Sequence, residues 1–185
     1  MRPLPALAAA VIMLAMTLVP AAAQPSSAFD HEFEAIEGGR MPLGAWRGKA
    51  LLVVNTASFC GYTPQYEGLQ KLWERYEPKG LVVIGVPSND FGAQEPKSEA
   101  EILGFCKGAY NVTFPLTTKV GVKGGDAHPF YRWARDVLGA GSAPGWNFHK
   151  YLVGRDGKLI AGYGSAVDPL SPQLVKAIEA ALAAR

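Results

Sequence analysis

The sequence has few of the residues that build metal or phosphate sites. Its three histidines, His31, His128 and His149, are scattered among 185 residues without the spacing of metal ligands, so we expect structural or surface roles for them. No glycine-rich phosphate loop with its lysine occurs. Charged residues make up 18% of the chain, the net charge is +2, and there is no basic run. The composition therefore gives no reason to expect nucleic acid or a charged membrane surface as a partner.

Long hydrophobic runs are confined to the N-terminus. Arg2 is followed by an apolar run from Leu4 to Val19 and then by three alanines ending at Ala23, an order typical of a secretory signal peptide. We expect residues 1–23 to be a signal peptide, and the protein to be exported, periplasmic or secreted. A retained anchor is the alternative, but the uninterrupted core is short for the ~20 apolar residues of a membrane span. After cleavage we expect no integral membrane segment, and residues 24–185 have the length of one domain.

Cysteine is also scarce, with Cys60 and Cys106 alone. In an exported chain, two cysteines indicate either one structural disulfide or a redox pair, and their number does not decide between these. Cys60 follows the apolar strand predicted for residues 50–54 and precedes Thr63 and Pro64, which are typical of an N-cap and of a first helical position. A thiol before a helix N-terminus has a pKa below the ~8.5 of a free cysteine. The alternative is a buried cysteine that acts as a small hydrophobe.

The remaining pattern predicts an α/β domain with a thioredoxin-like fold, in which helices flank a central mixed sheet. Two apolar strands joined by a helix predict a parallel βαβ unit. The polar loop at residues 88–96 then leaves the second strand at the same sheet edge as Cys60, and that edge binds ligands in open α/β sheets. The expected elements are an N-terminal hairpin within residues 29–48, strands at 50–54, 81–87, 112–116, 148–153 and 158–163, and helices at 64–76, 98–107, 129–137 and from 171 to the C-terminus.

Three segments together resemble the signature segments of the glutathione peroxidase family. They are Asn55-Thr56-Ala57-Ser58-Phe59-Cys60-Gly61-Tyr62-Thr63, Pro87-Ser88-Asn89-Asp90-Phe91-Gly92-Ala93-Gln94-Glu95-Pro96 and Trp146-Asn147-Phe148. The resemblance implies that Cys60 is the peroxidatic residue and that Gln94, Trp146 and Asn147 complete a catalytic tetrad. It also implies reduction of hydrogen peroxide and of organic or lipid hydroperoxides, without a cofactor. The amide N–H groups of Gln94 and Asn147 and the indole N–H of Trp146 can stabilise the negative charge that develops as a thiolate cleaves an O–O bond.

Cys106 resembles the resolving cysteine of the non-selenium, two-cysteine, thioredoxin-dependent members of this family. The resemblance implies that Cys60 becomes a sulfenic acid, that Cys106 condenses with it to a disulfide, and that a thioredoxin-like protein recycles the pair. In the alternative, Cys106 is a buried helix residue and a small thiol such as glutathione resolves Cys60. The segment between Val137 and Trp146 is short and lacks the longer insertion that tetrameric members of the family use for assembly, so the resemblance also implies a monomer.

Two residues depart from the family pattern, and two other functions stay open. Ser88 stands where a cysteine is usual, and Asp90 where an amide is usual; we expect Asp90 to point to solvent or to pair with a lysine or arginine. One alternative function is an exported thiol–disulfide oxidoreductase. The Cys-x-x-Cys pair usual in such proteins is missing, because Thr63 stands where the second cysteine would be. The other is a non-enzymatic module with a structural Cys60–Cys106 disulfide.

Overall fold

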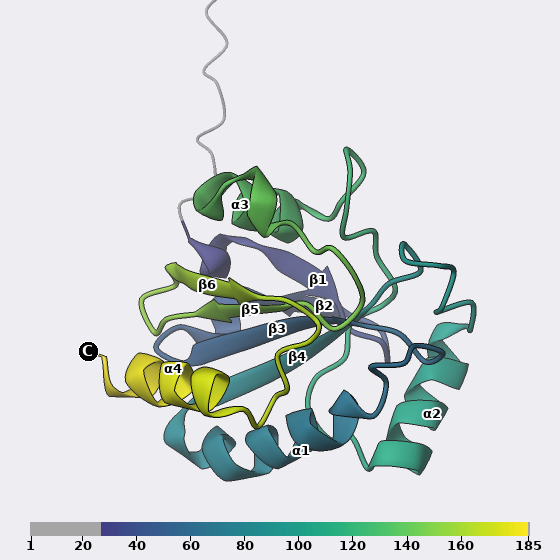
Figure 1. The fold of residues 1–185 in the computed structure, drawn as a ribbon, viewed down its shortest axis with the longest axis horizontal. Coiled ribbons are helices and arrows are strands. Elements are labelled where there is room, and N and C mark those ends of the chain that lie inside the picture. The colour runs from purple at the N-terminus through teal and green to yellow at the C-terminus, as the bar shows by residue number, and fades with distance from the viewer. Residues whose placement is uncertain (1–26, 185) are drawn as a thin grey trace, which may run out of the picture.

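The computed structural model describes residues 27–184, so the predicted signal peptide lies outside the described residues. Its central sheet has four strands, with helices on both sides (Figure 1). The strands are β1 (Glu32–Glu34), β2 (Arg40–Pro42), β3 (Ala50–Thr56), β4 (Leu81–Pro87), β5 (Lys150–Val153) and β6 (Leu159–Tyr163). The α-helices are α1 (Gln65–Tyr76), α2 (Glu99–Tyr110), α3 (Pro129–Leu138) and α4 (Pro172–Ala183), and short 3₁₀ turns lie at Ala28–Asp30, Leu43–Trp46, Glu77–Lys79 and Ala140–Ser142.

The sheet is mixed, with strand order β4-β3-β5-β6. β3 and β4 are parallel and joined by α1, whereas β5 pairs antiparallel with both β3 and β6. β1 and β2 form the predicted N-terminal hairpin as a separate antiparallel sheet. The predicted βαβ unit and the predicted N-terminal hairpin are therefore confirmed.

Strand β3 is apolar throughout because both faces of the sheet are covered. Leu52 and Val54 pack with residues of α1, α2 and α4, whereas Leu51 and Val53 pack with α3 and the N-terminal segment. Side chains alternate between the faces of a strand, so a strand between two helical layers needs apolar residues at successive positions. In Figure 1, α1 and α4 lie on one side of the sheet and α3 on the other.

The strand predicted at residues 112–116 is wrong. This segment makes only an isolated parallel bridge, from Leu116 to Gly85 of β4, and the adjoining Thr117 bridges to Ala35. Pro115 has no N–H to continue a ladder. At this bridge the segment lies alongside β4, because the Gly85 N–H donates to the Pro115 carbonyl and the Thr117 N–H donates to the Gly85 carbonyl, both at 2.9 Å. A Cβ on Gly85 would lie 2.5 Å from Leu116 Cδ2. Pairing of this segment with β4 is therefore limited to the single bridge at Gly85.

Helix α2 starts as predicted and ends later than predicted. Ser98 is its N-cap, in a capping box with Glu101, and the helix continues three residues beyond Lys107 to Tyr110. Asn111 then ends it in the left-handed conformation, with φ of 51°. Across residues 27–184, no helix has the length and apolar character needed to cross a membrane.

Candidate active site

Cys60 lies in the turn between β3 and α1, and the hydroxyl of Thr63 holds that turn. Thr63 Oγ1 accepts a hydrogen bond from the Cys60 backbone N–H at 3.0 Å and donates one to the Ala57 carbonyl at 2.9 Å. The prediction that Thr63 is the N-cap of the helix is wrong, because α1 begins at Gln65 after Pro64 and has no side-chain cap. The hydroxyl is engaged inside the Cys60 turn, where it fixes the loop that carries the thiol.

The thiol of Cys60 is almost fully buried, although residues close to it in the sequence are exposed. Cys60 is 8% exposed, and its Sγ accepts a hydrogen bond from the Tyr62 backbone N–H at 3.4 Å. Phe59 and Tyr62, on either side, are 58% and 36% exposed.

The structure brings Gln94 and Asn147 into direct contact. Asn147 is fully buried, and its Nδ2 donates to Gln94 Oε1 at 2.9 Å. The carbonyl of Gln94 in turn accepts from the backbone N–H of Phe59 at 3.0 Å. Phe59 directly precedes Cys60, so this bond joins the 88–96 loop to the Cys60 turn.

Trp146 lies beside the same loop. A Cβ added to Gly92 would lie 3.6 Å from Trp146 Cη2 and 3.5 Å from Gln94 Cγ, so the indole and the Gln94 side chain flank this glycine. The carbonyl of Trp146 accepts from Asn55 Nδ2 at 3.1 Å, at the end of β3. Within residues 27–184, the hydrogen bond to the Cys60 sulfur comes from Tyr62 and from none of Gln94, Trp146 and Asn147.

Cys106 is a second buried thiol, on α2. Both cysteines are free in this structure. Burial raises the pKa of the Cys106 thiol to about 11, and the facing Tyr66 hydroxyl opposes that shift in part. Cys106 is therefore a poor nucleophile in its resting position, because the thiolate is the reactive form.

The carboxylate of Asp90 is occupied by backbone groups. Its Oδ2 accepts hydrogen bonds from the N–H groups of Val122 and Lys123, at 2.6 and 3.1 Å. The expectation that Asp90 points to solvent or pairs with a lysine or arginine side chain is thus wrong. Ser88 is buried and accepts from the Asp90 N–H at 3.4 Å. Asp90 shapes the 121–126 loop, whose open N–H groups its carboxylate satisfies.

Sequence reasoning missed a buried polar cluster beside these residues. Glu95 is fully buried, and its Oε2 accepts from the Ser58 hydroxyl at 3.0 Å. Tyr66, which the sequence pattern assigns to the apolar face of α1, has its hydroxyl near Cys106 and Thr56. The signal in the sequence was a carboxylate directly after Gln94, inside a segment already assigned to the site.

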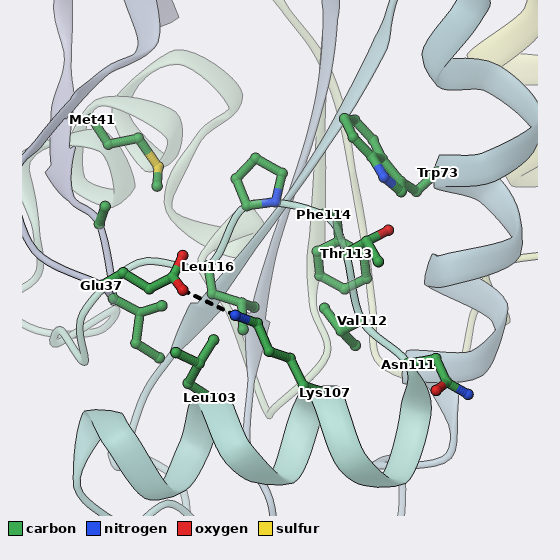
Figure 2. Close-up of a pocket in the computed structure, with 13 residues that line it drawn as sticks. Glu37, Met41, Trp73, Leu103, Lys107, Asn111, Val112, Thr113, Phe114 and Leu116 are labelled. Carbon is green, nitrogen blue, oxygen red and sulfur yellow. Dashed lines mark hydrogen bonds and ion pairs between the residues drawn. The ribbon is translucent and has the colours of Figure 1, made fainter.

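A cavity of about 700 Å³ lies on another side of α2 (Figure 2). Leu103 and Lys107 of α2 contribute to its wall, opposite Met41 and the 112–116 segment. Figure 2 shows Lys107 reaching towards Glu37, with which it forms an ion pair at 2.9 Å. Both partners are largely exposed, so this pair adds little to stability. Cys106 does not line this cavity. Cys106 and Ile102 are the two buried residues of α2.

Comparison with known proteins first defines the class. The apo crystal structure of Trgpx matches with a TM-score of 0.66 and 34% sequence identity, over 85% of this chain and 95% of that one. A thiol:disulfide interchange protein of the thioredoxin family from Chlorobium tepidum matches with a TM-score of 0.63 over 88% of this chain and 99% of that one, at 14% identity. The latter likeness shows the fold alone. The protein is thus a thioredoxin-fold protein with a cysteine at the β3–α1 turn, and the predicted fold is confirmed.

The sequence comparisons then identify the family. The family model described as glutathione peroxidase matches residues 28–135. A hydroperoxy fatty acid reductase of Synechocystis is 46% identical over 143 residues, which cover 73% of this chain and 85% of the relative. A glutathione peroxidase-like peroxiredoxin of Schizosaccharomyces pombe is 43% identical over 136 residues, covering 72% and 85%. The chain belongs to the glutathione peroxidase family and is a thiol peroxidase of its non-selenium branch.

Proposed function

We propose that Cys60 is the residue that attacks the hydroperoxide. Its thiolate takes the nearer oxygen and becomes a sulfenic acid, the O–O bond breaks, and the other oxygen leaves as alkoxide or hydroxide and is protonated to alcohol or water. Gln94, Trp146 and Asn147 supply neutral N–H donors to the sulfur and to the oxygen that leaves. Donors of this kind stabilise charge only where it develops, and loss of one typically costs ~2.7–4 kcal/mol of transition-state stabilisation.

One observation carries this assignment, the hydrogen bond from Asn147 to Gln94. Because Gln94 Oε1 accepts that bond, the amide NH2 group of Gln94 stays available as a donor. The carbonyl of the same residue is bonded to the residue before Cys60. The amide is therefore held by a fully buried partner on one side and by the Cys60 turn on the other, which is the support that a preorganised donor needs.

We propose that Cys106 resolves the sulfenic acid and that a thioredoxin-like dithiol protein reduces the resulting disulfide, with glutathione as the alternative reductant. A disulfide requires a Cα separation of ~4.4–6.8 Å, so α2 has to open locally where its cysteine starts out farther away. Three features support such opening. Only Ile102 and Cys106 of α2 are buried, the helix borders a cavity, and glycines stand at positions 104 and 108.

The substrates that we propose are hydrogen peroxide and organic or lipid hydroperoxides. The Synechocystis relative is named a hydroperoxy fatty acid reductase, which supports the lipid part. Exposed Phe59, Tyr62 and Trp146 near the site offer apolar surface to such a substrate. We further propose that the protein acts as a monomer after export, with residues 1–23 as its signal peptide. N-terminal sequencing of the exported protein and light scattering test these last two points.

Mass spectrometry of the cysteines tests the proposed function. The reduced protein, given one equivalent of hydrogen peroxide, should form a Cys60–Cys106 disulfide that a dithiol reduces again. Cys60→Ser should abolish peroxide consumption. Cys106→Ser should retain the first oxidation and lose turnover with the dithiol.

Each alternative predicts a different result in the same experiment. A bridge present before oxidation and resistant to mild reductant would favour a structural module. Unchanged thioredoxin-coupled turnover in Cys106→Ser would refute its resolving role. Exchange of disulfides in a substrate protein without peroxide consumption would indicate a thiol–disulfide oxidoreductase.

A further inference from the structure

Lys150, the first residue of β5, is a lysine with no exposed surface. Its ammonium donates three hydrogen bonds, to Gln65 Oε1 at 2.6 Å, to the Phe148 carbonyl at 2.9 Å and to the Val167 carbonyl at 2.6 Å. An ammonium has three N–H donors and no acceptor, so these bonds use all of its capacity. All three partners are uncharged, and a charge buried in this way is costly. The position therefore needs an explanation.

The first partner of Lys150 belongs to the segment that carries the peroxidatic cysteine. Gln65 is the first residue of α1, and its backbone N–H donates to the Tyr62 carbonyl at 2.9 Å. The Tyr62 N–H in turn donates to Cys60 Sγ at 3.4 Å. Two hydrogen bonds thus lead from the residue that Lys150 binds to the sulfur.

The second partner belongs to the segment that carries two of the predicted donors. Phe148 directly follows Trp146 and Asn147, and its φ of 63° lies in the left-handed region, which is strained for a bulky residue. Its N–H donates to the Asn55 carbonyl at 2.6 Å, and Lys150 binds its carbonyl. Strained residues persist only where their surroundings hold them, and they cluster at functional sites. Lys150 supplies part of that support, directly after Asn147.

Resting on the proposed function of Cys60, we propose that Lys150 is a positioning residue that fixes the Cys60 turn relative to the Trp146–Asn147 segment. It acts through Gln65 on one side and through Phe148 on the other, and it touches neither the sulfur nor the substrate. Hydrogen bonds from an ionised donor are roughly twice as strong as bonds between neutral groups, so an ammonium suits this joint. A displacement of about 1 Å between reacting groups can lower a rate by about 10²-fold.

The protonated form of Lys150 fits this role at neutral pH. Burial lowers the pKa of Lys150 to about 8, and the charge of Asp168 opposes that shift in part. The ammonium is therefore the main form at pH 7. A neutral amine would have only two N–H donors for the three oxygens.

A single-turnover experiment on Lys150→Met tests the proposal, because methionine fills similar space without any N–H donor. The reduced protein is mixed with one equivalent of hydrogen peroxide, and the Cys60 sulfenic acid is trapped and quantified by mass spectrometry. We expect Cys60 oxidation to be at least tenfold slower than in the wild type. Alkylation of Cys60 by iodoacetamide, followed in the same way, needs none of the predicted donors and should change less than threefold. A fall of equal size in both reactions would overturn the positioning role.

Two variants of Gln65 isolate its contact with Lys150. Both Gln65→Glu and Gln65→Leu remove the bond from Gln65 Nε2 to the Ser165 carbonyl, but only glutamate keeps an oxygen for the ammonium. We expect oxidation within threefold of the wild type in Gln65→Glu and at least fivefold slower in Gln65→Leu. The double variant of Lys150→Met with Gln65→Leu should be no slower than Lys150→Met alone, because both changes break one connection.

The matched control is Tyr76→Phe, which removes the hydrogen bond from a buried hydroxyl at the other end of α1 to Glu179. It should lower stability to urea and leave Cys60 oxidation unchanged. Oxidation within threefold of the wild type in Lys150→Met, or an equal fall in Tyr76→Phe, would refute the proposal. If Lys150→Met does not fold, the two Gln65 variants decide. Absence of sulfenic acid in the wild type would refute the proposed function itself, which is a separate outcome.

Discussion

Asn147 donates from Nδ2 to Gln94 Oε1 at 2.9 Å, across 53 positions of the chain. The bond fixes which end of the Gln94 amide is occupied and leaves its NH2 group as the free end. Asn147 is itself buried and follows Trp146, whose carbonyl is held by Asn55 at the end of β3. The orientation of the predicted donor therefore depends on the sheet.

The first prediction concerns this amide. Gln94→Glu keeps the acceptor for Asn147 and removes the NH2 group, so we expect a 10²- to 10³-fold lower rate of Cys60 oxidation, the typical cost of one lost transition-state donor. Stopped-flow measurement of Cys60 oxidation by hydrogen peroxide checks this. Gln173→Glu, on an exposed position of α4, is the control. A Gln94→Glu rate within threefold of the wild type would show that the amide does not assist O–O cleavage.

The second prediction concerns the opening of α2. A Cβ at Gly104 or Gly108 would meet no atom within 4 Å, so alanine fits at both positions. Each replacement should stabilise the helix by ~1 kcal/mol, since glycine is that much less favourable than alanine in a helix. We expect the double variant to unfold at a higher urea concentration. We also expect it to form the Cys60–Cys106 disulfide at no more than about one fifth of the wild-type rate. Gly125→Ala, in open space outside α2, is the control. Higher stability with an unchanged disulfide rate would mean that helix opening does not limit resolution.

The third prediction concerns Lys97, which links the two cysteine segments. Its Nζ lies 5.0 Å from the ring centroid of Phe59 and 4.3 Å from that of Phe105, and each phenylalanine directly precedes a cysteine. Such contacts contribute ~0.5–1 kcal/mol at exposed sites. Lys97→Met should lower the free energy of unfolding by about 1 kcal/mol and speed disulfide formation, because it releases α2 from the Cys60 turn.

The control for Lys97 is Lys79→Met, which removes a cation–π contact with Tyr76 far from α2 in the chain. It should change stability without changing the disulfide rate. Slower disulfide formation in Lys97→Met would indicate that the contact guides the cysteines together and does not restrain them.

The fourth prediction concerns pH and stability. Burial lowers the pKa of both His31 and His149 to about 4, from 6.5 in an unfolded chain. Between pH 6.5 and 4 the unfolded state binds protons that the folded state does not, so the free energy of unfolding falls as the pH falls. The slope is at most ~1.4 kcal/mol per pH unit for each histidine. Urea unfolding from pH 4 to 7 measures it. His149→Gln should flatten the curve, and an identical slope in that variant would contradict the assignment.

Chain chemistry alone was enough for most of the secondary structure. Uninterrupted apolar runs indicated β3 and β4, and the helices predicted from residues 98 and 171 are α2 and α4. These signals are local, since capping, turn formation and alternation of faces act over a few residues. Three separated motifs also identified the family.

Contacts between distant segments decided the rest. The 112–116 segment is no strand because it pairs with β4 only in an isolated bridge at Gly85. Thr63 closes the Cys60 turn because Ala57 comes within reach of its hydroxyl. Neither contact has a local sequence signal. Burial of Glu95, whose carboxylate accepts a hydrogen bond from Ser58 of the Cys60 turn, likewise follows from tertiary packing. A carboxylate in a sequence looks the same whether it faces water or the protein interior, and only the packing of the chain around it sets its surroundings and hence its chemistry.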